Sequence, residues 1–387
     1  MLMKIDNPET RATSSLVSPK DEAELVAFVA ESHAQVAPFR IAGGGTRFPP
    51  GTVEADRTVT TRALTGIVAY EPGALTLIAR AGTPLEDVAD ALAAEGQALA
   101  FEPMDHRAIL GSNGTPTIGG VVSANVSGPR RLQAGACRDH LLGVKFVDGQ
   151  GRTIKNGGRV MKNVTGLDLG KLLCGSYGTL GILTEVALKT LPIAEQQQSL
   201  ALPDITLHKA SEIFAAALAT PFGVSGAAYL AGTAWLRVEG FGSQVDYRVK
   251  RLKELFRDQE IDVVEDAASR SAWRDLRDVK HFAESSDPLW RILIKPSEAP
   301  QVVEALQRLG GEASVDWGGG LIWFCGTAES SAVRKAAGEG QGMLVRRGSL
   351  PAADHFPPEA SAVARLSASL RKTFDPAGIL NPGLMGD

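Results

Sequence analysis

Three glycine-rich segments in the first half of the chain constrain its fold more than any other feature. The first, Gly43-Gly44-Gly45-Thr46, directly follows a short strand expected over residues 38–42. The second, residues 117–120, opens an expected helix, and the third, residues 175–181, runs into an expected strand from Ile182. Backbone without side chains can approach an anion closely and point its N–H groups at it. Together the segments indicate a site for a phosphate-bearing ligand.

Each segment taken alone also has a purely structural explanation. The first is compatible with a plain turn, the second with close packing of a helix on a strand, and the third with a β-bulge. Neither the lysine-containing loop of P-loop proteins nor the GxGxxG motif of dinucleotide-binding Rossmann folds occurs in the sequence, which argues against both folds. The combination of three segments is much less compatible with chance than any one of them.

The composition is that of an ordinary globular protein. The chain has 387 residues, which favours two domains, and a formal net charge of -4, which gives no indication of nucleic-acid binding. Its first residues lack the apolar core of a signal peptide, and no run of about 18 apolar residues occurs. We therefore expect a cytoplasmic protein with no transmembrane segment, with peripheral attachment to the inner face of the plasma membrane through partners left open.

The cysteines and histidines do not form a metal-binding pattern. Cys137, Cys174 and Cys325 contain no CxxC pair, which argues against an iron–sulfur cluster or a structural zinc and fits a reducing compartment. None of the six histidines is paired at ligand spacing. We therefore expect no metal site in this chain.

Short strand and helix patterns alternate along the chain, which favours an α+β fold. Ser18 and Pro19 are predicted to begin the first helix. Residues 144–154 are predicted to form a hairpin, and residues 182–189 a half-buried strand that Pro192 ends. The stretch 194–203 has little periodicity and is the predicted domain boundary. We expect a first domain at 1–193, a second domain at 200–346, and a C-terminal segment at 347–387.

The glycine segments recur within longer motifs that carry a family resemblance. The motifs are PFRIAGGGT, TIGGVVSANVSG, RDHLLGVKFVDGQG, GLDLGKLLCGSYGTLGILTEVALK and the closing FDPAGILNPG. In this order they resemble the vanillyl-alcohol-oxidase and p-cresol-methylhydroxylase (PCMH) family of flavoproteins. The resemblance implies a two-subdomain FAD-binding domain, an α/β cap domain, and a tail that returns to the FAD domain. Within the family, the wording CGSYGTLG is most similar to the FAD-binding subunits of bacterial glycolate oxidases.

The resemblance also implies which residues hold FAD. The first segment would surround the diphosphate, the second would line its other side and the nearby ring, and the third would approach the adenosine half and the flavin. The expected FAD-binding residues are Gly43, Gly44, Gly45, Thr46, Arg47, Thr117, Ile118, Gly119, Gly120, Ala124, Asn125, Gly128, Gly175, Ser176, Gly178, Thr179, Gly181, Ile182 and, in the returning tail, Asn381.

The sequence departs from the family pattern at three places. Members with covalent flavin often carry a histidine in or beside the first segment, whereas Thr46-Arg47-Phe48 contains neither His nor Cys, so we expect non-covalent FAD. The third segment usually reads GSEGTLG in the family, and Tyr177 replaces the glutamate. The family's 2-hydroxy-acid dehydrogenases carry a late HxGDGNxH motif that helps bind a metal, and this motif is absent here.

Oxidation of a 2-hydroxy acid needs a cation for the carboxylate and a group that takes the hydroxyl proton. Arg291, on an expected cap strand, is a candidate for the cation, and His106 and His281 are candidates for the proton acceptor. Each also has a structural explanation, as a salt-bridged strand arginine or as a histidine that packs or lies on the surface. The catalytic residues therefore stay open.

Three functions are compatible with these patterns. By resemblance, the chain is the FAD-binding subunit of a glycolate oxidase complex, where it oxidises a small 2-hydroxy acid to a 2-oxo acid or relays electrons between a catalytic FAD subunit and an iron–sulfur subunit. Alternatively, it is a self-sufficient FAD-dependent 2-hydroxy-acid oxidoreductase. The third alternative is a non-catalytic assembly module on an FAD fold.

Overall fold

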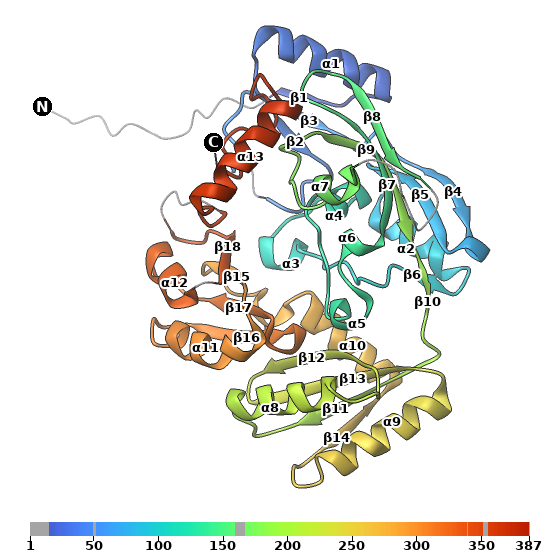
Figure 1. Ribbon diagram of the computed structural model, residues 1–387, viewed down its shortest axis with the longest axis vertical. Coiled ribbons are helices and arrows are strands. Elements are labelled where there is room, and N and C mark those ends of the chain that lie inside the picture. The colour runs from blue at the N-terminus through green and yellow to red at the C-terminus, as the bar shows by residue number, and fades with distance from the viewer. Residues whose placement is uncertain (1–14, 49–51, 159–166, 339, 351–354, 387) are drawn as a thin grey trace, which may run out of the picture.

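The computed structural model describes residues 15–48, 52–158, 167–338, 340–350 and 355–386. A small parallel sheet and a five-stranded antiparallel sheet occupy the upper part of Figure 1, and an eight-stranded antiparallel sheet occupies the lower part. The α+β expectation is confirmed, because helices and strands of both halves alternate along the chain.

The first element is a parallel sheet that helix α1 covers. Its strands, in spatial order, are β1 (Ser15–Val17), β3 (Arg57–Thr60) and β2 (Arg40–Ala42). Helix α1 (Glu22–Gln35) buries Leu25 and Val29 in the same core as Phe39. The predicted start at Ser18 and Pro19 is wrong by a few residues: Asp21 is the N-cap, because its side chain accepts a hydrogen bond from Glu24 N at 2.9 Å.

The third glycine segment runs directly into the five-stranded sheet, and the second lies beside one of its strand ends, where Gly119 N donates to Ala81 O at 2.8 Å. Its strands, in spatial order, are β4 (Ile67–Glu71), β5 (Thr76–Arg80), β9 (Ile182–Lys189), β7 (Leu141–Val147) and β8 (Thr153–Gly157). The predicted hairpin is confirmed as β7 and β8, and the predicted strand as β9. Strand β9 is buried along most of its length rather than on one face. The remaining elements of this half are α2 (Leu85–Ala93), β6 (Gln97–Ala98), α3 (Arg107–Leu110), α4 (Ile118–Ser123), α5 (Arg131–Ala134), α6 (Cys137–His140), α7 (Leu169–Leu173) and β10 (Leu191–Pro192).

The eight-stranded sheet packs most of its helices on one side, whereas α10 (Asp266–Arg277) and the first half of the chain lie on the other. Its order is β14 (Asp262–Glu265), β11 (Gln196–Leu202), β13 (Thr233–Gly240), β12 (Val224–Leu230), β16 (Glu312–Asp316), β17 (Leu321–Cys325), β15 (Leu289–Leu293) and β18 (Gln341–Arg346). Its helices are α8 (Leu207–Leu218), α9 (Gly242–Leu255), α10 (Asp266–Arg277), α11 (Ala299–Gln307) and α12 (Ser330–Ala337). Leu289 and Trp323 of this sheet share one core with Ile109 and Val126 of the first half.

Buried ion pairs join the first half of the chain to this sheet. Arg237 of β13 is 1% exposed and donates two hydrogen bonds to Glu102, at 2.8 and 3.0 Å. Glu239 lies 3.3 Å from Arg237 and 3.6 Å from Arg130. Burial alone raises the pKa of Glu102, but the charge and hydrogen bonds of Arg237 outweigh burial and hold that pKa below its usual value. Removing one partner of such a pair typically costs about 3–5 kcal/mol, so these residues determine how the two halves meet.

The C-terminal tail returns to the first sheet. Helix α13 (Ser361–Phe374) lies beside the upper part of the molecule in Figure 1, and the chain beyond it pairs Leu380 with Phe39. Phe39 N donates to Ile379 O at 3.0 Å. This return agrees with the architecture that the resemblance implied, whereas the domain limits at residues 193, 200 and 346 stay predictions.

Within the residues that the structure describes, no helix combines the length and the apolar character needed to cross a membrane. The same residues contain no group of three or more His, Cys, Asp or Glu side chains arranged to hold a metal ion. The three cysteines are all buried and free.

We predict that Asp316, at the end of β16, makes the stability of the folded chain depend on pH. Burial raises its pKa from 3.8 to about 7. Between about pH 4 and 7, the folded state therefore keeps a proton that the unfolded chain has lost. The contribution of Asp316 to the free energy of unfolding is complete below about pH 4 and is lost as the pH rises through about 7. The free energy of unfolding should fall by up to about 4 kcal/mol across this range. Asp316→Asn should remove most of the fall, as measured by urea unfolding across that range. Asp262→Asn, at an exposed strand position, is the control; an unchanged profile in Asp316→Asn would refute the prediction.

Candidate functional site

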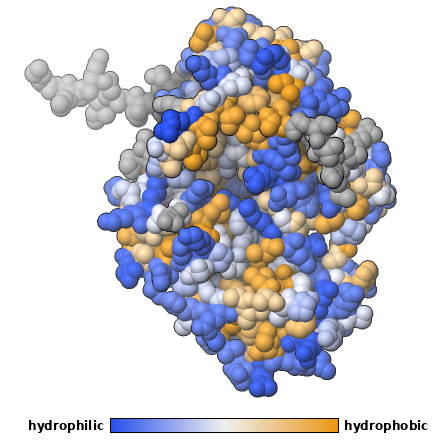
Figure 2. Space-filling model, in the orientation of Figure 1, coloured by the Kyte–Doolittle hydropathy of each residue, from blue (hydrophilic) through white to orange (hydrophobic). Residues whose placement is uncertain are grey.

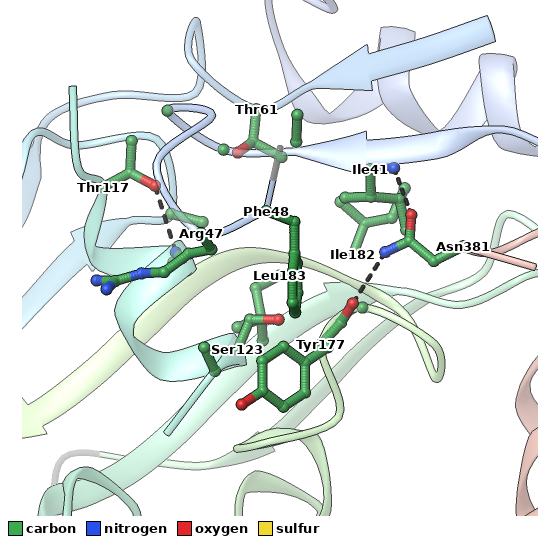
Figure 3. A pocket seen from close by; sticks show the side chains of 18 of the residues that line it. Ile41, Arg47, Phe48, Thr61, Thr117, Ser123, Tyr177, Ile182, Leu183 and Asn381 are labelled. Atoms are coloured by element: carbon green, nitrogen blue, oxygen red, sulfur yellow. Dashed lines mark hydrogen bonds between the residues drawn. The ribbon is translucent and has the colours of Figure 1, made fainter. Parts of the chain in front are cut away.

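A cleft of about 830 Å³, including space open to solvent, lies where the glycine segments meet the C-terminal tail. We call it the glycine cleft. Figure 3 shows Thr61, Thr117 and Asn381 reaching it from different elements. Most of the residues expected to bind FAD line it, namely Gly43, Gly44, Gly45, Thr46, Arg47, Thr117, Gly119, Gly120, Ala124, Gly178, Gly181, Ile182 and Asn381. Segments far apart in the sequence therefore share one concave surface.

The first glycine segment offers N–H groups that have no protein acceptor. Its glycine carbonyls each accept a side-chain hydrogen bond, at 3.1 to 3.2 Å: Gly43 from Thr60, Gly44 from Arg62 and Gly45 from Ser112. Among the described residues, no acceptor bonds to the N–H groups of Gly44, Gly45 or Thr46. Gly45 has φ +73°, and a side chain there would project into open space. These donors are suited to an anion such as a diphosphate.

The first segment lies so close to the second, and to Thr115 just before it, that Gly43 and Gly44 must lack side chains. A Cβ on Gly44 would lie 1.5 Å from Thr115 O, and a Cβ on Gly43 would lie 2.6 Å from Thr117 Oγ1. Either contact is far inside van der Waals distance. These two glycines therefore allow the backbones of the first two segments to meet at the cleft.

The N–H groups at the start of α4 already have protein acceptors. Ile118 N donates to Thr83 O at 3.0 Å, Gly119 N to Ala81 O at 2.8 Å, and Gly120 N to Thr117 Oγ1 at 3.3 Å. A Cβ on Gly119 would lie 2.6 Å from Ala81 Cβ, so Gly119 permits α4 to pack beside β5. The second segment therefore shapes the cleft, and the first supplies the free donors.

Asn381 connects the first and third segments. Its Oδ1 accepts from Ile41 N at 2.7 Å, and its Nδ2 donates to Tyr177 O at 2.9 Å, as the dashed lines in Figure 3 show. Asn381 has φ +46°, in the left-handed region that Asn tolerates better than most residues. The returning tail therefore holds the two loops at a constant separation.

The other residues expected at the cofactor lie outside the cleft. Asn125 lines a neighbouring cavity, and Thr179 lines a groove beside the tail. Ile118 is fully buried in the core, and Ser176 Oγ donates to Leu173 O at 2.9 Å. Gly175 N donates to Ser123 O at 3.0 Å, and a Cβ on Gly128 would lie 2.4 Å from Glu102 O. The contacts described for these last residues are with protein, and their role at FAD stays a prediction.

Several residues of the cleft had no sequence signal. The cleft wall also includes Arg40, Ile41, Ala42, Phe48, Val53, Thr61, Ala81, Ser123, Tyr177, Leu183 and Leu384. Most belong to strands or loops in which a residue's side chain gives no hint of a ligand. Tyr177 is distinctive in the sequence, because it replaces a glutamate that is typical of the family.

A second cavity of about 490 Å³, including space open to solvent, adjoins the glycine cleft. We call it the arginine cavity. Arg47, Phe48, Ala124 and Tyr177 line both spaces and form the wall between them. In Figure 3 the side chains of Arg47 and Tyr177 point away from Asn381. The other lining residues are Met104, His106, Asn125, Val126, Ser127, Arg291, Trp323, Met343 and Val345.

Arg47 and His106 are in contact at the wall of the arginine cavity. Arg47 Nη1 donates to His106 Nδ1 and, at 3.3 Å, to Met104 O. Burial and the adjacent Arg47 charge hold the pKa of His106 well below 6.5, and burial lowers the pKa of Arg47 to about 10. At neutral pH, Arg47 is therefore charged and His106 is neutral with its proton on Nε2. Because a guanidinium can only donate, this contact engages the Nδ1 lone pair and fits a role for His106 in positioning Arg47, whereas its role as a proton acceptor stays a prediction.

The structure separates the other two catalytic candidates. Arg291, on β15, lines the arginine cavity, and its guanidinium carbon lies 5.2 Å from the centre of the Trp317 ring. His281 is not among the described residues that line the glycine cleft or the arginine cavity. Its Nε2 lies 2.8 Å from Ser314 Oγ, and burial lowers its pKa to about 4. These contacts fit a packing role for His281 and a ligand-facing role for Arg291.

Comparison with known proteins identifies relatives of the chain. The FAD binding domain family matches residues 13–157. Glycolate oxidase subunit GlcE of Escherichia coli (strain K12) is 34% identical over 363 residues, which cover 93% of this chain and 96% of that subunit. Glycolate oxidase subunit GlcD of Bacillus subtilis (strain 168) is 30% identical over 188 residues, which cover 48% of this chain and 38% of that subunit.

A solved structure shows the same fold. Alkyldihydroxyacetonephosphate synthase superimposes with a TM-score of 0.67 over 95% of this chain and 76% of that chain, at 15% sequence identity. At this identity the likeness concerns the fold alone. Because it covers nearly the whole chain, it includes the eight-stranded sheet as well as the first half.

We predict that removing the Asn381 side chain weakens FAD binding at least tenfold. Asn381→Gly keeps the left-handed backbone accessible but removes both hydrogen bonds that join the first and third segments. The measurement is titration of flavin fluorescence with purified protein. Asn156→Gly, which removes side-chain bonds to Leu167 and Leu169 away from the cleft, is the control. Equal FAD affinity in Asn381→Gly and the unchanged chain would show that the two Asn381 hydrogen bonds are not needed for FAD binding.

The glycine cleft fits a bound dinucleotide. It joins free N–H donors on the first segment to an apolar wall that includes Ile41, Ile182 and Leu183. Both features are typical of cofactor sites, in which a few polar groups orient a largely apolar ligand surface. With the match to GlcE over almost its entire length, the chain belongs to the family of glycolate oxidase subunit GlcE, within the FAD-linked oxidoreductases that have a PCMH-type FAD-binding domain.

Proposed function

We propose that this chain is the FAD-binding subunit of a glycolate oxidase or dehydrogenase complex and holds FAD non-covalently in the glycine cleft. The observation that carries the proposal is the row of N–H groups at Gly44, Gly45 and Thr46, which line the cleft without a protein acceptor. A diphosphate offers these donors a negatively charged acceptor. The coverage of 96% of the E. coli GlcE subunit supports the same assignment.

The side chains around the cleft support non-covalent attachment. A covalent link to flavin requires a nucleophilic side chain such as His, Cys or Tyr. Among the described residues, neither His nor Cys lines the glycine cleft, and burial raises the pKa of Tyr177, so its hydroxyl keeps its proton and is a weak nucleophile. His106, in the arginine cavity, has its Nδ1 in contact with Arg47. Cys137 is fully buried in the core, and Cys174 Sγ lies 3.6 Å from Asn125 Oδ1. FAD should therefore be released when the chain is denatured.

The residues of the glycine cleft would bind the cofactor of such a subunit, and those of the arginine cavity would contact a small ligand. When bound, FAD would accept the electrons that a 2-hydroxy acid loses as it becomes a 2-oxo acid. The first glycine segment would bind the diphosphate, and Asn381 would hold that segment against the third. Arg47 and Tyr177, which line both spaces, would face the cofactor on one side and a small ligand on the other. Apolar side chains such as Trp323 and Val345 would limit water in the arginine cavity.

An exposed apolar face on helix α13 supports assembly of this chain with partner subunits. Helix α13 has no buried residue and exposes Val363, Leu366 and Leu370 by 49%, 68% and 39%. Their spacing places them along one side of the helix. Figure 2 shows apolar side chains gathered in this part of the surface. Exposed apolar patches of this kind are typical of protein interfaces.

The partners that we propose are a catalytic FAD subunit and an iron–sulfur subunit. The relatives named GlcE and GlcD are both called subunits of glycolate oxidase, which supports an assembly with more than one flavoprotein. The chain itself has only three cysteines and no CxxC pair, so a separate subunit would carry iron–sulfur clusters. We place the complex in the cytoplasm, attached peripherally to the inner face of the plasma membrane through those partners.

One observation favours the alternative of a self-sufficient 2-hydroxy-acid oxidoreductase. Arg291 lines a cavity that adjoins the cleft, which is the place that a carboxylate-binding residue would occupy. No specific observation favours the assembly module, because the free donors of the first segment would then have no ligand.

We expect the purified chain to contain one FAD per polypeptide and to release it into the supernatant on acid precipitation. The measurement is the absorbance spectrum of the two fractions. A colourless protein that takes up no added FAD would contradict the proposed function. Flavin that stays with the precipitated polypeptide would contradict only the non-covalent attachment.

We expect the isolated chain to transfer electrons from glycolate to a dye at less than about a tenth of the rate of the complex recovered from native cells, because its partners supply the main catalytic site. The recovered complex should contain a second flavoprotein and a cysteine-rich ferredoxin-like subunit, identified by mass spectrometry. Brisk activity of the isolated chain would instead establish the self-sufficient alternative.

A further inference from the structure

The arginine cavity contains the guanidinium groups of Arg47 and Arg291, and among the described residues no carboxylate forms an ion pair with either. The charges of Asp105 and Asp278 act on Arg47 without a direct contact. The nearby acids already have arginine partners: Asp105 lies 2.7 Å from Arg107, and Asp278 lies 2.8 Å from Arg277. The ionisable groups that act on Arg291 are the Tyr177 hydroxyl and the positively charged Arg131. The cavity therefore carries an excess of positive charge at a place where burial lowers the pKa of both arginines.

Hydrogen-bond donors in this cavity also outnumber acceptors. Arg47 Nη2 is buried without a partner in the described part of the chain. Arg291 lies over the Trp317 ring and makes no hydrogen bond to a described residue. Within the described part of the chain, the Tyr177 hydroxyl has one hydrogen-bond partner, Met343 Sδ, a weak acceptor at 3.6 Å. Burial raises the pKa of Tyr177, so its hydroxyl keeps its proton and acts as a donor.

The ligand that matches these groups is small and has a carboxylate. A carboxylate has two oxygens that accept from an arginine fork, and it neutralises a buried guanidinium. The apolar remainder of the wall includes Val126 and Val345, and the centre of a water-sized sphere can occupy only about 40 Å³ of the cavity, so a ligand there has few atoms beyond the carboxylate. We infer that the arginine cavity of this chain binds the carboxylate of a small 2-hydroxy or 2-oxo acid through Arg291, Arg47 and Tyr177, without a metal ion.

This site deepens the proposed function, on which it rests for its relation to FAD. Arg47 and Tyr177 line both spaces, so an acid bound here lies next to whatever fills the glycine cleft. Arg291 lines only the arginine cavity, so it can be changed without touching the cleft. A competing role for the two arginines is to stabilise negative charge on the reduced flavin, and the experiment below distinguishes the two.

The test measures oxalate and glycolate binding to the purified FAD-loaded chain by calorimetry and by the change in flavin absorbance. Glycolamide, which is close in shape to glycolate but uncharged, is the ligand control. Arg291→Gln should weaken oxalate binding at least tenfold while FAD content stays at one per chain. Arg291→Lys keeps the charge but loses the planar pair of donors, so its oxalate affinity should lie between those of the unchanged chain and Arg291→Gln. Arg334→Gln is the matched control, because Arg334 also lies over a tryptophan ring, that of Trp290 at 5.7 Å, but does not line the cavity.

Each outcome decides the proposal. Saturable binding of oxalate that Arg291→Gln weakens, and that stays within about twofold of normal in Arg334→Gln, supports the proposal. No oxalate binding to the unchanged chain, or equal binding in Arg291→Gln, overturns it while leaving FAD binding intact. A changed flavin potential in Arg291→Gln with unchanged oxalate affinity assigns the arginines to the flavin and also overturns it. If the chain takes up no FAD, the proposed function fails, and calorimetry on the flavin-free protein still tests the cavity.

Discussion

The contact between Gly44 and the backbone of Thr115 sets the geometry on which the rest of the site depends. It brings two segments more than sixty residues apart so close that no side chain fits between them. With the carbonyls of the first segment bound to Thr60, Arg62 and Ser112, its N–H groups remain as the unused polar groups at the cleft. The capacity to bind an anion thus arises from how the loops pack, and no charged side chain is required.

A second constraint is the way in which the eight-stranded sheet meets the first half. The Glu102–Arg237 pair is buried at this junction, and Trp323 and Val345 share a core with residues of the first half. The arginine cavity exists only because of that junction, since Arg47 comes from the first half and Arg291 from the sheet. The same ion pairs that stabilise the fold therefore also set the distance between the two arginines.

Much of the cofactor cleft was predictable because glycine clusters are local signals. The order of the motifs also predicted the fold and the returning tail with Asn381. What sequence reasoning missed depends on long-range contacts: Arg237 pairs with Glu102 across 135 positions, and neither residue differs in type from a surface charge. The first helix begins at Glu22 because Asp21, rather than Ser18, reaches a free N–H group. Gly128 belongs to a glycine-rich motif, yet its close neighbour is the Glu102 backbone.

The most direct test of this account is a crystal structure of the chain with FAD. The account predicts diphosphate density in the glycine cleft, within hydrogen-bond distance of the backbone N–H groups of Gly44, Gly45 and Thr46. FAD bound with its diphosphate away from this segment, or a cleft that stays empty at saturating FAD, would contradict it.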